Sequence, residues 1–169
     1  MSTLRFARHQ EDSAPIPAPA EQVFAYLDDH RRLAAHMSRS SWRMGGGTME
    51  TILDEGRGER IGSHIRMSGR ILGLELALDE VVTERTPPLR KVWETVGTPR
   101  LLVIGSYRMA FEIEARGTAS RLQVFIDYDV PSTPLGRWLA RLFGRSYARW
   151  CTRTMVADAV QHFHSGRTE

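Results

Sequence analysis

The fold is decided by residues 132–163, STPLGRWLARLFGRSYARWCTRTMVADAVQHF. Ser132 or Thr133 fits the N-cap of a helix, and Pro134 fits the first helical position, where the missing N–H is tolerated. Apolar residues then recur with the i, i+3, i+4, i+7 spacing of one helical face over about eight turns. The spacing predicts one long helix, Ser132 to about Phe163, whose apolar face is Leu135, Trp138, Leu139, Leu142, Phe143, Tyr147, Trp150, Cys151, Met155, Ala159 and Phe163.

A helix with such a face needs a wide apolar surface, and the preceding residues supply it as strands. Segments 106–114 and 121–130 alternate apolar and polar residues, with a hairpin turn at Arg116-Gly117-Thr118 between them. This alternation is typical of antiparallel strands with one covered and one solvent-exposed face. The predicted covered faces are Tyr107, Met109, Phe111 and Ile113, and Leu122, Val124, Ile126, Tyr128 and Val130.

The rest of the chain reads as shorter strands and two short helices. Gly45-Gly46-Gly47 indicates a bulge or bend and not a phosphate loop, because no Lys-Ser/Thr and no helix follow it. The predicted strands are 4–16, 49–54, 61–68, 74–86 and 89–96, and the predicted short helices are 19–27 and 30–37.

Length and composition bound the class of protein. The 169 residues fit one domain, 1–169, large enough for a core that holds a pocket. A hydrophobic fraction of 41% with 25% charged residues is ordinary for a soluble protein, and the net charge is only +3. Cys151 is the only cysteine, which excludes an intrachain disulfide. No signal peptide or membrane-spanning segment is recognisable, so we expect a cytoplasmic protein.

The front of the chain carries the most specific family resemblance. Residues 15–29, PIPAPAEQVFAYLDD, step through prolines and alanines into a Val-Phe helix. The strand Glu80–Glu84 followed by Pro87-Pro88, and the strand Tyr107–Glu112, are similar to family segments too. Essentially the whole chain resembles the START-like, or polyketide cyclase/dehydrase and lipid-transport, superfamily (SRPBCC).

The resemblance implies an α+β helix-grip fold. In that fold a seven-stranded antiparallel sheet wraps around a long C-terminal helix, and two short helices follow the first strand. The space between sheet and helix is a hydrophobic cavity, where members bind lipids, sterols, polyketides or quinones. Some members are cyclases or hydrolases. The superfamily has no universal catalytic motif, so the resemblance implies no catalytic residue, and we expect no cofactor.

The candidate ligand site consists of aromatic and methionine side chains on the facing surfaces of helix and sheet. Such side chains suit an apolar ligand with one or two oxygens, and the alternative is that they simply fill a core. Tyr107 and Tyr128 are the stronger candidates, because a buried phenol needs a partner. The candidate ligand-binding residues are Trp93, Tyr107, Met109, Phe111, Ile126, Tyr128, Phe143, Tyr147, Trp150 and Met155.

Three polar residues are candidates for the polar end of the cavity. His64 and Arg66 share one strand face, which points either to solvent or into the cavity. Glu94 points inward if Val92 and Val96 do, and it is then a general acid/base candidate. If Trp93 points inward instead, which its bulk favours, Glu94 is solvent-exposed.

Glycine and arginine mark the first half of the long helix. Gly144 allows either a close approach of the helix to the sheet, with a kink, or a break between a short helix and the main one. The arginines recur every four residues and wind around the helix. They form either a solvated face or a surface for an anionic partner such as a membrane, and no aromatic-basic motif favours nucleic acid. They are Arg137, Arg141, Arg145, Arg149 and Arg153.

Metal and thiol chemistry are not favoured. His162 and His164 point to different sides of a helix, and His30 and His36 lack further ligands at useful spacing, so we expect no metal site. Cys151 lies on the apolar face, which indicates a buried, inert thiol.

Three functions remain open. The preferred hypothesis is a module that binds, and thereby transports or sequesters, a small hydrophobic molecule such as a lipid, polyketide or quinone-like compound. The second is a cyclase or dehydratase that uses polar cavity residues. The third is a partner-regulating protein that docks through the arginine-bearing helix. The sequence names neither the ligand nor the oligomeric state.

Overall fold

The computed structural model describes residues 6–33, 48–71 and 73–166. In this part of the chain, a seven-stranded antiparallel sheet has the order β1-β7-β6-β5-β4-β3-β2. Strands β2 to β7 lie side by side in chain order, and β1 is the edge strand next to β7. The strands are β1 Arg8–Ile16, β2 Thr48–Leu53, β3 His64–Ile71, β4 Leu74–Thr86, β5 Arg90–Arg100, β6 Tyr107–Arg116 and β7 Ala119–Tyr128.

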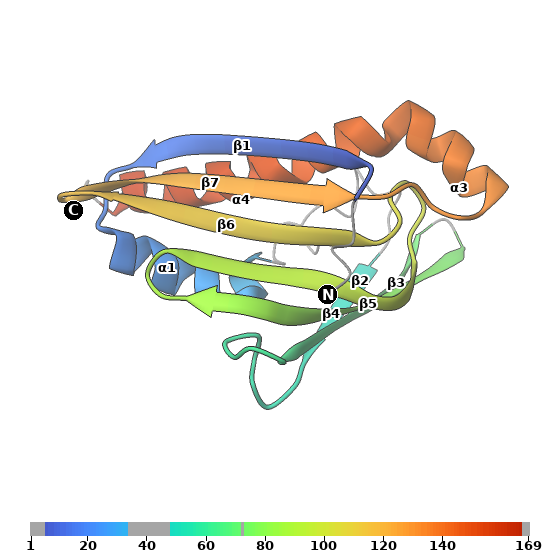
Figure 1. The fold of residues 1–169 in the computed structure, drawn as a ribbon, viewed down its shortest axis with the longest axis horizontal. Helices are drawn as coiled ribbons and strands as arrows, with labels where there is room; N and C mark the ends of the chain where they lie inside the picture. The colour runs from blue at the N-terminus through green and yellow to red at the C-terminus, as the bar shows by residue number, and fades with distance from the viewer. Residues whose placement is uncertain (1–5, 34–47, 72, 167–169) are drawn as a thin grey trace.

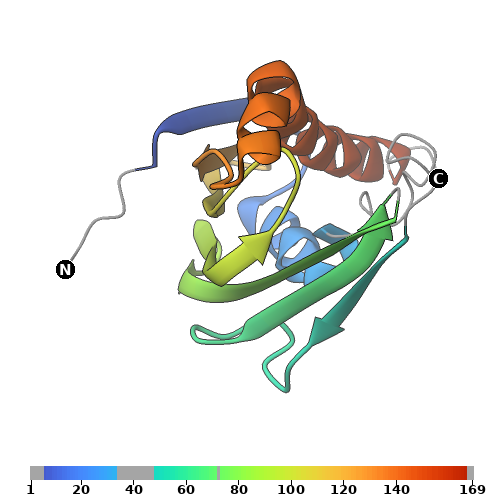
Figure 2. The ribbon, with the colours of Figure 1, turned by 90° about the vertical axis from the view of Figure 1, so that its right-hand side faces the viewer.

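Helices cover the concave side of this curved sheet (Figures 1 and 2). Helix α1 (Ala20–Asp28) follows β1 and buries Val23, Phe24 and Leu27, as its sequence predicts. Residues 30–33 are helical again, and the rest of the predicted helix 30–37 lies outside the described residues, as does Gly45-Gly46-Gly47. The C-terminal helix runs through α3 (Pro134–Leu139), the π-helical turn η1 (Ala140–Gly144) and α4 (Arg145–Ser165). Thr133 caps it, accepting a hydrogen bond from the Gly136 N–H.

The second half of this helix holds the core together. Helix α4 packs against β1 and β7 and buries Cys151, Met155 and Ala159, which confirms the predicted face there. The predicted covered faces of β6 and β7 are buried as well, from Tyr107 to Ile113 and from Leu122 to Tyr128. Alternation therefore gave the correct inward faces of both strands.

The first half of the helix departs from the prediction. Leu135, Trp138, Leu142 and Phe143 are 53–59% exposed, so the predicted apolar face is wrong over α3 and η1. The inward side is taken by small residues at a spacing of four, Gly136, Ala140 and Gly144. A Cβ on Gly144 would lie 2.9 Å from the Val103 carbonyl oxygen, so the helix comes close to the loop that follows β5 and not, as predicted, to the sheet itself.

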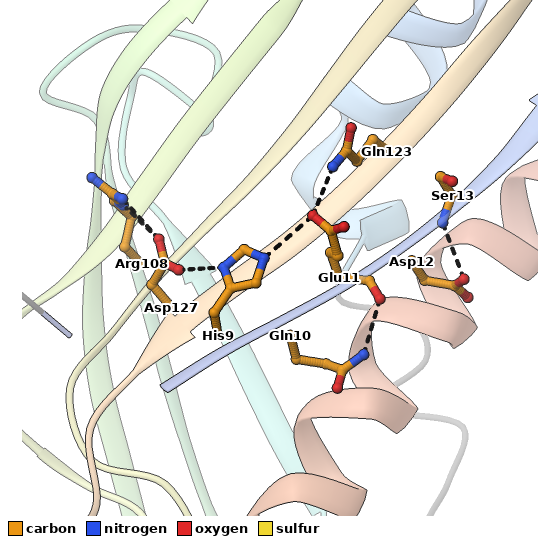
Figure 3. Close-up of polar contacts among 8 residues, drawn as sticks. All are labelled: His9, Gln10, Glu11, Asp12, Ser13, Arg108, Gln123 and Asp127. Carbon is orange, nitrogen blue, oxygen red and sulfur yellow. Dashed lines mark hydrogen bonds and ion pairs between the residues drawn. The ribbon is translucent and has the colours of Figure 1, made fainter. Parts of the chain in front are cut away.

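The outer face of the sheet is polar. His9 Nδ1 lies 2.6 Å from Asp127 Oδ1, and Arg108 donates to Asp127 Oδ2 at 2.7 Å (Figure 3). Gln123 donates to Glu11 in the same row. Strands β1, β6 and β7 are thus bridged by side chains on the solvent side, while their apolar side chains face the helix.

Candidate ligand cavity

A cavity lies between α4 and strands β2 to β7. Its volume is about 60 Å³, room for a few water molecules, and its wall is mainly apolar. Four methionines contribute to the wall: Met49, Met67, Met109 and Met155. Because a methionine side chain is unbranched and flexible, this wall is able to rearrange around a larger molecule.

Much of the predicted apolar site lines this cavity. Trp93 is 2% exposed and points inward, which settles the orientation of β5 that the sequence left open. Tyr107 and Met109 come from β6, and Tyr147 comes from the start of α4. The predicted residues in the cavity wall are Trp93, Tyr107, Met109, Ile126, Tyr147 and Met155.

Four other predicted residues lie elsewhere. Phe111 and Tyr128 are buried in the core outside the cavity wall, Phe111 in edge-to-face contact with Phe24. Trp150 is partly buried at the edge of the core, with its ring 5.8 Å from that of Tyr147. The inward placement of Phe143 is wrong, since its side chain is 53% exposed.

The three predicted polar residues are outside the cavity. His64 and Arg66 point to the outer sheet face, where Asp79 lies 2.9 Å from His64 Nδ1 and 3.4 Å from Arg66 Nε. Glu94 is opposite Arg108 in the β5–β6 register and is not in the cavity wall. With Trp93 facing inward, the pleat turns Glu94 outward. Of the two placements that the sequence left open for these residues, the one outside the cavity is therefore correct, and for Glu94 it is the one that the bulk of Trp93 favoured.

Different residues supply the polar end of the cavity: His30, Glu80 and Tyr107, here called the Glu80 cluster. The Tyr107 hydroxyl donates a hydrogen bond to Glu80 Oε1, and His30 Nε2 lies 3.5 Å from Glu80 Oε2. His30 and Glu80 are 2% and 1% exposed, and both line the cavity. A carboxyl group and an imidazole therefore meet in an otherwise apolar space.

The Glu80 cluster is incompletely hydrogen-bonded. Glu80 Oε2 and His30 Nδ1 have no hydrogen-bond partner within the part of the chain that the structure describes. A buried polar atom without a partner costs about 1–3 kcal/mol, so such atoms call for an explanation. Burial, followed by the nearby Glu80, raises the pKa of Tyr107 well above its ordinary value. Its phenol thus keeps its proton and acts as a hydrogen-bond donor.

Tyr107 of this cluster was predicted as a ligand-site residue, and the sequence also held a signal for Glu80. Leu76, Leu78, Glu80 and Val82 alternate along β4, so the periodicity that marks Leu78 as inward also marks Glu80. His30 carries no such signal, because it follows the end of α1, where no repeat fixes its direction.

The thiol of Cys151 also lines the cavity. The predicted burial of this thiol is confirmed, and burial raises its pKa to about 12, which favours the protonated sulfur. The adjacent Cys151, followed by burial, raises the pKa of Tyr147. Neither group is a nucleophile near neutral pH. Among the described residues, no three His, Cys, Asp or Glu side chains gather as a metal site would require.

A second buried cluster closes the end of α1: Asp28, Arg85 and Lys91, here called the Asp28 cluster. Lys91 Nζ lies 2.9 Å from both the carbonyl oxygen and Oδ1 of Asp28, and Arg85 donates to Asp28 Oδ2 at 2.7 Å. Burial alone would raise the pKa of Asp28, but hydrogen bonds from Arg85 and Lys91 outweigh it and lower the pKa. Since Asp28 ends α1, these cations also stabilise the helix C-terminus.

Solved structures with this architecture support the fold. TTHA0849 from Thermus thermophilus superposes with a TM-score of 0.63 at 14% identity, over 96% of this chain and 100% of that one. The Zhui aromatase/cyclase from Streptomyces sp. R1128 gives 0.63 at 14% identity, over 93% of each chain. Norcoclaurine synthase from Thalictrum flavum gives 0.62 at 10% identity, over 95% and 96%. At such identities the likeness concerns the fold alone.

A comparison with curated proteins found no match to the chain. A comparison with family profiles did find one. The profile described as polyketide cyclase / dehydrase and lipid transport matches residues 8–162, nearly the whole length. No helix in the described residues is long and apolar enough to cross a bilayer. The helix-grip fold, the cavity under α4 and this match agree, and the chain belongs to the polyketide cyclase / dehydrase and lipid transport family.

Proposed function

We propose that this protein binds a small, mainly apolar molecule that carries a hydroxyl group, in the cavity between sheet and α4. The observation that carries the proposal is the Glu80 cluster. A ligand hydroxyl that donates to Glu80 Oε2 would satisfy a buried acceptor that no described residue satisfies. The surrounding apolar wall suits a lipid, polyketide or quinol-like body. Because the cavity measures only about 60 Å³, a larger ligand would displace methionine side chains.

Native mass spectrometry of the purified protein, before and after organic extraction, tests this proposal. We expect a bound small molecule that extraction removes. Leu78→Phe, which fills the cavity from β4, should abolish the bound mass. The matched control is Leu74→Phe on the same strand, where the side chain is 47% exposed. Equal ligand retention by both variants would contradict binding in this cavity.

A second candidate function is acid–base catalysis on a carbonyl-bearing ligand. It is favoured by the geometry of Tyr107 and Glu80, a protonated phenol beside a carboxylate in a site shielded from water. Glu80 would accept a proton from the carbon next to the carbonyl. The Tyr107 hydroxyl would then turn from Glu80 Oε1 and donate its single hydrogen bond to the enolate oxygen. Such a step begins a cyclisation or a dehydration of a polyketide-like compound.

Hydrogen–deuterium exchange at the carbons beside the carbonyl of 2-tetralone tests the second candidate. The protein should accelerate exchange, followed by NMR, and Glu80→Gln should remove the acceleration. The control is Glu94→Gln, because Glu94 is partly buried outside the cavity. An exchange rate equal to that in buffer would exclude this chemistry for that probe and leave the binding proposal intact.

A further inference from the structure

The first half of the C-terminal helix carries an exposed apolar ridge, made of Leu135, Trp138, Leu142 and Phe143. Their exposed fractions are 59%, 58%, 53% and 53%. Surface leucines occur singly in most proteins, but large apolar side chains gathered on one helix segment mark an interaction site. The stability of the isolated chain therefore does not explain why these side chains are exposed.

The packing of the helix against the rest of the protein does not use these large side chains. Gly136, Ala140 and Gly144 are the buried residues of α3 and η1, and neither glycine leaves room for a side chain. A Cβ on Gly136 would lie 2.6 Å from Pro131 Cβ, and one on Gly144 would lie 2.9 Å from Val103 O. The large residues are thus held on the outside by the contacts of the small ones.

Arginines accompany the apolar ridge. Arg137, Arg141 and Arg145 are exposed along the same turns, and Arg149 and Arg153 continue the series. No acidic residue occurs between 131 and 157 in the sequence. Among the ion pairs of the described residues, none involves these arginines. The helix therefore carries five exposed positive charges that pair with no carboxylate in the described part of the chain.

The position of this segment suits contact with a flat surface. Figure 1 shows α3 extending past the ends of β1 and β7, and Figure 2 shows the same helix end at one extreme of the molecule. The loop that follows β5 lies underneath, since Val103 contacts the helix at Gly144 while Leu101 and Ile104 line the cavity. One short loop thus separates the apolar ridge from the ligand cavity.

We propose that the helix segment 134–145 docks on an anionic lipid bilayer. Its large apolar residues would enter the interface, and its arginines would contact the phosphate groups of anionic lipids, as in amphipathic interfacial helices. A second copy of the chain fits less well. A two-fold interface sets the same patch against itself, so the unpaired arginines of two protomers would repel each other. This proposal does not depend on the identity of the cavity ligand.

Co-flotation of the protein with lipid vesicles tests the docking. We expect binding to phosphatidylcholine vesicles that contain phosphatidylglycerol, at least tenfold weaker binding to phosphatidylcholine alone, and a decrease with added salt. The double change Trp138→Ser with Leu142→Ser should weaken binding at least tenfold, and Arg137→Gln or Arg141→Gln about fivefold each. Trp138→Phe should retain binding but reduce the blue shift of tryptophan emission.

Matched changes elsewhere on the surface serve as controls. Leu89→Ser, at a side chain 48% exposed, and Arg116→Gln should leave vesicle binding unchanged. Three results would overturn the proposal. They are no binding to the anionic vesicles, equal binding by the Trp138→Ser/Leu142→Ser variant, or a dimer in ultracentrifugation that this variant loses. If the natural partner is an acidic protein and not a membrane, the protein would not bind the anionic vesicles.

Discussion

The Asp28 cluster and the Glu80 cluster differ in how many of their polar atoms have a partner. They are close in the chain, since Asp28 and His30 are only two positions apart. In the Asp28 cluster each carboxylate oxygen meets a cation, and Lys91 also binds the last carbonyl of α1. In the Glu80 cluster one carboxyl oxygen and one imidazole nitrogen have no hydrogen-bond partner among the described residues. A cluster complete in itself holds the fold together, whereas an incomplete one beside a cavity indicates a ligand site.

The largest expected effect comes from breaking the complete cluster. Lys91→Met keeps the apolar stem but removes the cation that binds Asp28. Losing one member of a buried ion pair is strongly destabilising, and because Arg85 still pairs with Asp28 we expect a loss of about 3 kcal/mol in the free energy of unfolding. Urea denaturation measures it. The exposed pair of Arg66 with Asp79 is the control, where Arg66→Gln should cost less than about 1 kcal/mol.

Glu80→Gln should leave stability nearly unchanged. The amide oxygen still accepts the Tyr107 hydroxyl, and the buried carboxyl group is removed from an apolar cavity. We expect the free energy of unfolding to stay within about 1 kcal/mol of wild type. A loss as large as that of Lys91→Met in the same denaturation experiment would mean that both clusters are structural.

Acid should weaken the Asp28 cluster through protonation of its carboxylate. The pKa of Asp28 is lowered in the folded state, so below about pH 4 the unfolded chain binds more protons. The stabilisation by Asp28 is complete above that pH and is lost as the pH falls through the folded pKa. Stability measured against pH should therefore decrease less steeply in Lys91→Met than in wild type. Parallel curves would show that Lys91 does not influence this titration.

The smallest expected effect is at the outer face, where His9 is half exposed. The hydrogen bond with Asp127 raises the pKa of His9 against a smaller opposing effect of burial. Its stabilisation is present below about pH 6.5 and is lost as the pH rises through the raised folded pKa. His9→Gln should cost less than about 0.5 kcal/mol at acidic pH and nothing well above neutrality. Thermal melts of both proteins across this pH range measure the difference.

Prediction from sequence succeeded where one periodicity dominated. Alternation in β6 and β7 fixed both inward faces, and bulk placed Trp93 correctly. The prediction of the buried helix face failed over α3 and η1, because the spacing of apolar residues does not show which side of a helix packs against the protein. Gly136, Ala140 and Gly144 carried that information as close-packing residues.

The polar residues considered for the cavity do not line it. The sequence left the direction of His64 and Arg66 open, and in the structure Ile65 and Met67 occupy the inner side of β3. Glu80 could have been found by extending the alternation of β4. His30 could not, because its place depends on how the chain leaves α1 and not on any repeat.

The central claim is that a ligand hydroxyl completes the Glu80 cluster. Phenol and toluene have nearly the same shape and differ in that one group, so their affinities, measured by NMR titration, test the claim directly. We predict that phenol binds at least tenfold more tightly than toluene to the wild-type protein, and that Glu80→Gln removes most of this preference. Equal affinities of the two probes, or a preference for phenol that Glu80→Gln leaves intact, would contradict it.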